Sequence, residues 1–483
     1  MSVFLTRVFG VENMVKPSMK RGEMPTTKEA YQNVMKLAIP SVIEMVLTSV
    51  VGMIDMMMVG SVLGSTSISA VGLTSQPRMI LLSLFLALNV GVTTIVARRR
   101  GEERQKDANQ AFRNALLLSF LLSLVMMIPA VAFSRPLMVL AGSSEQTPDV
   151  LSTINQASSY FTILAYFLPI NAVTMAINAA QRGAGNTKLA MYVNVTSNLV
   201  NIVFNYLLIG GNLGFPKLGV VGAAIATGIG FTVGFIMALF SVIGKRHSDN
   251  FLFLKLKDNW RFHKESMKTI GTVGFNAALE QVALRVGFFL YAKIVFSLGT
   301  VAFASHQIAS QFINLSFTFG DGMAVAATAL VGQNMGRERP DLSQLYGKVA
   351  QRIALMISVL LVCVVVLLRY PLTSLYVNFD EANSMEVWGL AAQIMLFVAA
   401  FQPFQMSSVV ISGSLRGAGD NRYVAGVMLL CVVGIRVVSS YLAVNVLGLG
   451  ILGAWASSLI DMFVRLSLVY RRFHQGKWMQ IRI

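Results

Sequence analysis

The stretch Arg182-Gly183-Ala184-Gly185-Asn186-Thr187-Lys188 has a close copy later in the chain. The second copy is Arg416-Gly417-Ala418-Gly419-Asp420-Asn421-Arg422, 234 positions further on. A repeat at about half the chain length indicates one structural unit built twice. Other pairs keep the same order at nearly the same offset: Leu63 with Leu298, Gln76 with Gln311, Val96 with Val331, Gly101 with Gly336, and Pro169 with Pro403. The sequence therefore predicts a tandem duplication.

The composition predicts an all-α polytopic membrane protein. Hydrophobic residues make up 55% of the 483 residues and charged residues only 13%, against about 25% charged in a soluble domain. The mean hydropathy is +0.65. Twelve apolar segments each exceed the roughly 20 residues that cross a bilayer. They run over about 37–60, 69–97, 110–133, 152–180, 190–210 and 221–244, then 269–297, 303–332, 345–368, 386–414, 424–447 and 450–470.

The basic residues indicate how the chain is oriented in the membrane. Of the 39 Lys and Arg residues, 31 fall in loops and termini on one side and only Arg135, Lys217 and Arg369 on the other. Because cytoplasmic loops are enriched in Lys and Arg, both termini are expected in the cytoplasm of a cell-membrane protein. This placement indicates that the basic residues behind the net charge of +17 face anionic lipid and do not bind nucleic acid.

An even number of segments per half places the two halves in parallel, related by an axis along the membrane normal. We expect a cytoplasmic segment at 1–36, a six-helix bundle at 37–244, a cytoplasmic linker at 245–268, a second bundle at 269–470 and a tail at 471–483. The two cysteines, Cys363 and Cys431, both lie in apolar segments and do not support a disulfide scaffold.

Polar residues in the first half predict a cation site. Glu44 and Asp55 lie on one face of the first segment, and Asp55 needs a partner, a bound cation or a proton. A stripe at spacings of 4, 3 and 4 on the fifth segment offers amide oxygens, with Thr227 as a further candidate on the sixth. The stripe is Asn194, Asn198, Asn201 and Asn205. Interhelical packing is the alternative explanation for these amides.

The second half lacks this set. Under the repeat offsets Asp55 corresponds to Leu290, Asn201 to Ile435, Asn205 to Ser439, and Thr227 to Ser458. Packing needs are similar in both halves, so the difference favours H⁺ or Na⁺ binding at Asp55, Asn201, Asn205 and Thr227.

Other polar residues are candidates for a substrate cavity: Glu44, Gln76, Glu280, Gln281, Gln307, Gln311 and Asp321. Glu280 either faces a central cavity or pairs with Arg285. Asp461 and Arg465, four residues apart, predict a structural ion pair that Arg436 could join.

The repeated stretch is not a phosphate-binding loop, because Gly-x4-Gly-Lys-Ser/Thr is not satisfied. We interpret Arg182, Gly183 and Gly185, and likewise Arg416, Gly417 and Gly419, as turns whose basic residues lie at the lipid headgroups. Pro169 and Pro403 are hinge candidates, although static kinks would explain them equally. No nucleotide-binding domain or catalytic constellation is recognisable, which argues against an enzyme and against ATP-driven transport by this chain alone.

Several motifs together resemble the multidrug and toxic compound extrusion (MATE) family of the MOP flippase superfamily. They are Val51–Gly60, Leu279-Glu280-Gln281, Ala304–Ala309, Leu330–Gly336 and the paired Arg-Gly-Ala-Gly turns. The resemblance implies an exporter driven by H⁺ or Na⁺, with the cation at Asp55. Some members of the family carry Asp where this chain has Asn205, which leaves this chain one carboxylate fewer.

The resulting hypothesis is a monomeric secondary antiporter, without a cofactor or an ATPase subunit, that exports small organic and often cationic compounds. The closest alternative is a lipid-linked saccharide flippase, which needs a cationic cavity for pyrophosphate. An intramembrane enzyme is a second alternative.

Overall fold

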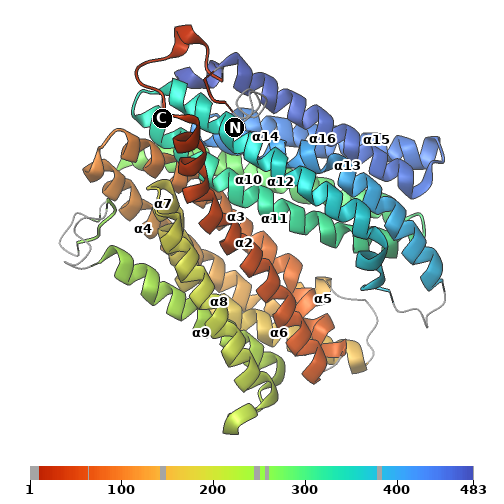
Figure 1. The fold of residues 1–483 in the computed structure, drawn as a ribbon. Coiled ribbons are helices and arrows are strands. Elements are labelled where there is room, and N and C mark those ends of the chain that lie inside the picture. The colour runs from red at the N-terminus through yellow and green to blue at the C-terminus, as the bar shows by residue number, and fades with distance from the viewer. Residues whose placement is uncertain are drawn as a thin grey trace. The chain divides into compact units, whose positions relative to one another are not determined.

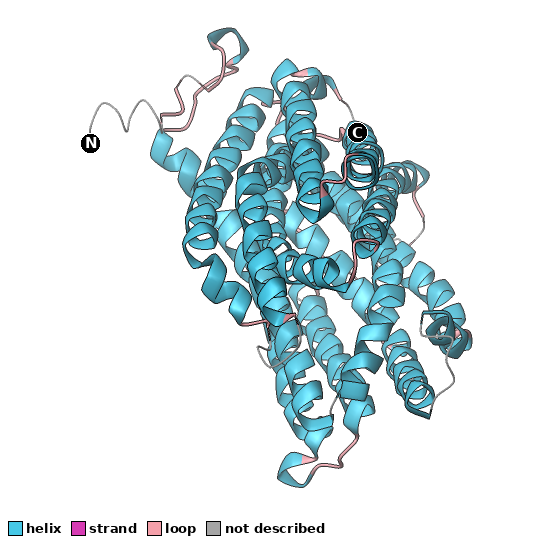
Figure 2. Cartoon of the chain, turned by 90° about the vertical axis from the view of Figure 1, so that its right-hand side faces the viewer, coloured by secondary structure: helices cyan, strands magenta, loops and turns pink. Residues whose placement is uncertain are grey.

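The computed structural model describes residues 10–12, 14–63, 65–141, 148–243, 251–255, 260, 262–377 and 383–481. Within these residues all regular secondary structure is helical (Figure 2). The chain divides into two compact units. The boundaries of these units differ from those of the two repeated halves. One unit is Ile43–Gly274, and the other joins Met1–Val42 to Phe275–Ile483.

The helices follow one another along the chain (Figure 1). The first half contains α2 (Thr27–Leu63), α3 (Ser65–Gly101), α4 (Gln105–Ala132), α5 (Ser134–Ala141), α6 (Pro148–Tyr166), α7 (Leu168–Gly183), α8 (Thr187–Gly210) and α9 (Gly219–Val242). The second half contains α10 (Lys264–Phe296), α11 (Thr300–Gly336), α12 (Pro340–Ser374), α13 (Ser384–Gly417), α14 (Asn421–Met428), α15 (Val437–Tyr441) and α16 (Gly450–Gln475). Two π-helical segments, Leu429–Arg436 and Leu442–Val446, flank α15.

The predicted all-α polytopic fold is confirmed. Among the described residues, ten helices are long and apolar enough to cross a membrane, and the bent pair α6–α7 raises the number of spans to eleven. The remaining expected span is α10, a helix of 33 residues. It is not among those spans, and it carries Glu280, Arg285 and Lys293 in its sequence. The short α5 was not expected from the sequence.

The two prolines of the repeat have different structural outcomes. The expected segment 152–180 is two helices, α6 and α7, which meet at a bend of 53°. Pro169 lies in the first turn of α7, where the lack of an N–H is tolerated because that donor has no helical partner. Pro403 instead lies inside the continuous helix α13. A hinge role for either residue stays a prediction.

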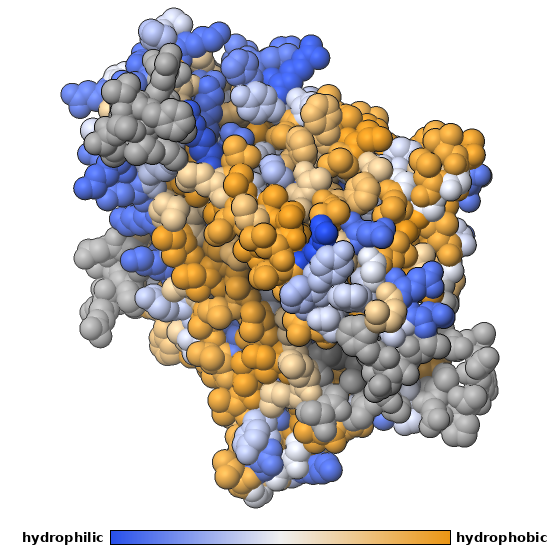
Figure 3. All heavy atoms as spheres, turned by 45° about the vertical axis from the view of Figure 1, so that its right-hand side comes forward, coloured by the Kyte–Doolittle hydropathy of each residue, from blue (hydrophilic) through white to orange (hydrophobic). Residues whose placement is uncertain are grey.

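Large apolar side chains cover the outside of the helices, as expected for contact with lipid. Ile80 is 65% exposed, Ile128 66% and Leu367 77%. Figure 3 shows one face on which hydrophobic residues predominate. Such exposure is unusual for a soluble protein and is compatible with a hydrocarbon solvent.

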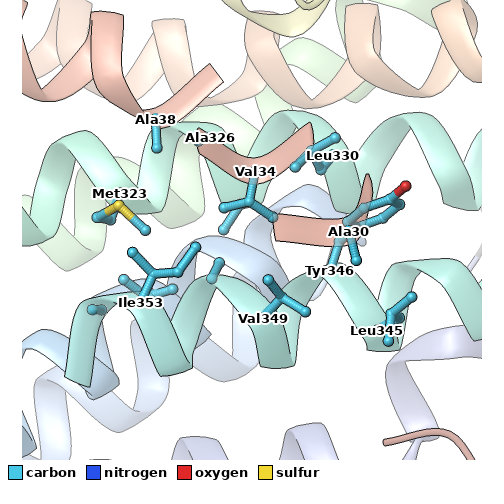
Figure 4. Close-up of a cluster of buried hydrophobic side chains, with 14 of the residues drawn as sticks. Ala30, Val34, Ala38, Met323, Ala326, Leu330, Leu345, Tyr346, Val349 and Ile353 are labelled. Carbon is cyan, nitrogen blue, oxygen red and sulfur yellow. The ribbon is translucent and has the colours of Figure 1, made fainter. Parts of the chain in front are cut away.

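The N-terminal segment belongs to the unit that contains Phe275–Ile483. Helix α2 begins after a reciprocal capping box, in which Thr26 N–H donates to Glu29 Oε2 at 2.9 Å and Glu29 N–H donates to Thr26 Oγ1 at 3.3 Å. Its first turns bury Ala30 and Val34 against α11 and α12 (Figure 4). The preceding Val15 is 1% exposed in the same cluster.

Candidate functional site

Helices α2 and α8 lie side by side in a fixed register. Three side-chain hydrogen bonds join them, and in each the donor lies 150 residues after the acceptor. The pairs are Asn194 with Glu44, Asn198 with Thr48, and Asn205 with Asp55. A constant sequence separation over three turns requires two parallel helices with the same rise. The asparagine stripe predicted from the sequence is therefore the face of α8 that contacts α2.

The structure brings the four predicted cation-site residues together. Asn205 Nδ2 donates to Asp55 Oδ1 at 2.7 Å and to Asn201 Oδ1 at 3.4 Å. Asn201 Nδ2 donates to Thr227 Oγ1 at 3.1 Å. Asn205 and Asn201 are buried, whereas Asp55 is half-buried. One hydrogen-bonded chain thus links α2, α8 and α9 through a single carboxylate.

This set of atoms fits a proton or a monovalent cation. Asp55, Asn201, Asn205 and Thr227 all offer oxygen, the ligand type preferred by hard cations. The buried Oδ1 of Asn205 accepts no hydrogen bond within the described residues. The same residues contain no group of three or more His, Cys, Asp or Glu side chains placed to hold a metal ion. Asp55 supplies the one negative charge among these four residues, and one H⁺ or Na⁺ matches that charge.

A cavity of about 270 Å³ opens beside Asp55 within the unit Ile43–Gly274. Polar side chains lie on one part of its wall and apolar ones on the rest. The polar lining residues are Thr48, Asp55, Arg78, Asn171, Ser197, Asn198, Asn201 and Thr227. Apolar lining residues include Phe161, Leu164, Met175 and Phe231. A pocket that joins an apolar wall to a few polar groups suits an amphipathic molecule.

Two residues next to this site did not emerge from the sequence patterns as site residues. Arg78, on α3, lines the cavity, and its charge acts on Asp55. Tyr160, on α6, is 6% exposed and interacts with Arg78 and Thr227. An intramembrane arginine was a recognisable signal. A single tyrosine in an apolar helix gave no signal of a functional residue.

The second half holds a different polar cluster in place of the cation site. Asp461 Oδ2 pairs with Arg436 and with Arg465, each at 2.7 Å, and all three residues are buried. The expected ion pair and its third member are confirmed. Ser439 donates to the backbone of its own helix at Ile435 and offers no carboxylate ligand. The cluster carries one negative and two positive charges, so it does not resemble a cation site.

The first arginine of each repeated stretch was expected to lie at the lipid headgroups. Each of them instead forms an ion pair with a glutamate. Arg182 Nη1 lies 2.9 Å from Glu44 Oε1. Arg416 pairs with both carboxylate oxygens of Glu280. Within the described residues Glu280 therefore pairs with Arg416 and not with Arg285, which corrects that alternative. Two charges removed from water are stable only when paired in this way.

The other substrate-cavity candidates have varied environments. Gln307, Gln311 and Asp321 are exposed, Gln281 is half-buried, and the side chain of Gln76 lies outside the described residues. Glu44 and Glu280 are buried in their ion pairs. A substrate role for these seven residues stays a prediction.

The glycines of the repeated stretch have two structural roles. A Cβ on Gly183 would lie 2.6 Å from the carbonyl oxygen of Thr93, and one on Gly417 would meet the carbonyl oxygen of Thr328. Gly185 has φ of 87° and Gly419 φ of 95°, in the left-handed region that favours glycine. The first glycine of each copy thus allows close helix packing, and the second forms the turn.

The comparisons with known proteins agree with this architecture. The MatE family model matches residues 40–207 and, a second time, residues 277–442, which together exceed half of the chain. The chain belongs to the MatE family. One MatE model matching twice agrees with the tandem duplication predicted from the sequence.

Curated relatives and solved structures cover almost the whole chain. The uncharacterized transporter YisQ of Bacillus subtilis is 26% identical over 428 residues, covering 87% of this chain and 89% of the relative. The probable multidrug resistance protein NorM of Thermotoga maritima is 27% identical over 420 residues, covering 85% of each. A solved structure of an outward-facing multidrug resistance MATE family transporter of the MOP superfamily has a TM-score of 0.84 at 23% identity. It covers 93% of this chain and 97% of that one, so the two share the MatE fold.

Proposed function

We propose that this protein is a secondary antiporter that exports small amphipathic organic compounds, often cationic, in exchange for H⁺ or Na⁺. The names of its relatives, which include a probable multidrug resistance protein, support this proposal. The coupling ion binds at Asp55, with Asn201, Asn205 and Thr227 as its neighbours. The protein works without a cofactor, as a monomer, with both termini in the cytoplasm.

The single observation that carries the proposal is the position of Asp55. Its carboxylate accepts a hydrogen bond from Asn205 and lines the cavity at the same time. An ion bound there and a cationic group bound in the cavity both draw on the same negative charge, so each weakens the affinity for the other. Antiport requires this kind of competition, since a ligand shifts a conformational equilibrium only through its differential affinity for the two states.

The mechanism follows from that competition. In the ion-free form Asp55 is negative, Asn205 stabilises the charge, and a cationic compound loads into the cavity. Entry of H⁺ or Na⁺ at Asp55 removes the attraction and favours release outside. Asn205 turns its amide donor toward Asp55, so a bound cation would require the Asn205 amide to present its oxygen instead.

The geometry favours this function over a lipid-linked saccharide flippase. Among the described residues lining the cavity, Arg78 is the one cationic side chain, and Asp55 balances its charge. A pyrophosphate group carries several negative charges and would call for a cluster of cationic donors. A flippase would move labelled lipid-linked saccharide between leaflets, which is the outcome that would support the alternative.

The test is efflux of a cationic dye, ethidium, from proteoliposomes that contain the purified full-length protein. A pH gradient is imposed alone in one experiment and a Na⁺ gradient alone in another. We expect at least one gradient to drive efflux, and an ionophore that collapses that gradient should stop it. Protein-free liposomes are the control. Absence of dye movement under both gradients would contradict the proposal.

A further inference from the structure

Arg78 is an unusual residue in the apolar helix α3. Within the described residues it takes part in no ion pair, and its buried Nε has no hydrogen-bond partner, although its side chain interacts with Tyr160. Its charge acts on Asp55, yet the carboxylate of Asp55 is instead bonded by Asn205. An arginine at membrane depth is costly, and such residues normally pair with a neighbour or a ligand. Tyr160 offers Arg78 a hydroxyl group but no counterion for its charge.

The second half of the repeat carries no equivalent. The offset that aligns Gln76 with Gln311 places Ile313 opposite Arg78. Ile313 packs against an apolar cluster, so this position in the helix requires no charge. Arg78 and Asp55 are therefore both specific to the half that contains the cavity. Their shared occurrence connects the guanidinium with ligand binding rather than with the common architecture.

The charges around the cavity indicate what it accepts. Asp55 and Arg78 are the two ionisable side chains among the described lining residues. Together they leave the cavity with no net charge but with a negative and a positive group on its wall. A guanidinium has a planar set of donors that matches a carboxylate. The apolar wall, which includes Phe161 and Phe231, suits a hydrophobic or aromatic body.

We propose that Arg78 is a specificity-determining residue that binds the acidic group of zwitterionic amphipathic substrates, while their cationic group lies toward Asp55. This inference rests on the proposed antiport function. It extends that function by naming a substrate class in which both charges are recognised. The cationic group still competes with the coupling ion at Asp55, so the sense of exchange is unchanged.

The test compares two dyes that differ only in the acidic group. Rhodamine B carries a free carboxylate and a cationic ring system, and its ethyl ester keeps the cation alone. Fluorescence anisotropy measures the Kd of each dye for the detergent-purified full-length protein, after subtraction of binding to protein-free micelles. The wild-type protein should bind the acid more tightly than the ester. The Arg78→Gln variant should weaken acid binding about tenfold, as expected for loss of a hydrogen bond between charged groups.

The ester distinguishes ligand recognition from a structural role. Its Kd should stay within about twofold of wild type in Arg78→Gln, because the ester has no group for Arg78 to bind. Arg78→Lys keeps the charge without the planar donor set, and we expect it to recover part of the acid binding. The matched control is Arg285→Gln, which removes an exposed cation of α10 outside the cavity lining. It should leave both dyes unaffected.

Three results would overturn the inference: equal binding of acid and ester by the wild-type protein, equal losses for both dyes in Arg78→Gln, or no loss for either. Binding at equilibrium needs no ion gradient, so these results are independent of the antiport assay. Failure of ethidium efflux would remove the proposed function even if the acid were preferred. Normal ethidium efflux without a preference for the acid would remove only the role of Arg78.

Discussion

Arg182 forms an ion pair of 2.9 Å with the buried Glu44, and Arg416 and Glu280 repeat this pair in the other half of the chain. In each half the carboxylate lies on the first helix, and the guanidinium lies on the first residue of the Arg-Gly-Ala-Gly stretch. The pair thus connects the first helix of the half to the turn between its fourth and fifth expected spans. Its duplication identifies it as part of the common architecture.

Arg182→Gln is therefore expected to destabilise the protein. It leaves Glu44 buried with only the Asn194 amide as a charge-neutral partner, at a cost of about 3–5 kcal/mol in the free energy of unfolding. The measurement is thermal unfolding in detergent. Arg104→Gln is the matched control, because its pair with Asp107 is 54% and 39% exposed and should contribute less than about 1 kcal/mol. The double variant Glu44→Gln/Arg182→Gln should recover stability, and a further loss would contradict the pairing.

Asp55→Asn should abolish ion-driven ethidium efflux. The substitution keeps the size of the side chain and its hydrogen-bonding capacity toward Asn205, but it removes the charge that H⁺ or Na⁺ neutralises. Initial efflux rates in proteoliposomes, normalised to reconstituted protein, provide the measurement. Glu386→Gln removes an exposed acid from the first turn of α13 and should keep the wild-type rate. Efflux that stays ion-dependent in Asp55→Asn would exclude Asp55 as the coupling residue.

Gly183→Ala should be destabilising although alanine favours helices. The added Cβ would lie 2.6 Å from the backbone oxygen of Thr93, so α3 and α7 must separate. Overpacking of this kind costs about 1–3 kcal/mol. Gly72→Ala is the control, because no heavy atom lies within 4 Å of its added Cβ and helix propensity should stabilise it by up to about 1 kcal/mol. Opposite shifts in unfolding temperature are expected, and similar shifts would refute the close contact.

Asp461→Asn should lower stability by about 3–5 kcal/mol, because it leaves Arg436 and Arg465 as two buried positive charges without a counterion. Unfolding of the purified protein in detergent reports the change. The double variant Asp461→Asn/Arg436→Gln removes one of the two charges and should restore part of the loss. If the single variant were as stable as wild type, the cluster would not be a structural ion pair.

The sequence predicted most of the helices from their apolar length and the duplication from the repeated stretch. It predicted the face of α8 near Asp55 from periodicity within one segment. A spacing of 4, 3 and 4 defines one face of α8 whatever that face contacts. Periodicity does not identify the contacting residue. The partner of Glu280 lies 136 residues away at Arg416, and the nearby Arg285 was the only partner that sequence distance could offer.

The same reasoning explains what the sequence missed in the site and the fold. Arg78 and Tyr160 reach the Asp55 site from separate helices through tertiary packing. The break between α6 and α7 depends on where Pro169 falls in the helical turn, which a hydropathy pattern does not resolve. Residues 1–36 were predicted only as a cytoplasmic segment, yet Val11 and Met14 are buried in a core together with Met323 and Ile353.

The sharing of α2 between the two compact units has a consequence for biosynthesis. Met1–Val42 belongs to the same compact unit as Phe275–Ile483, although the whole of Ile43–Gly274 lies between them in the sequence. Ala30 and Val34 therefore cannot make their contacts with α11 and α12 until those helices have been translated. The core between the first turns of α2 and helices α11 and α12 can therefore close only late in synthesis.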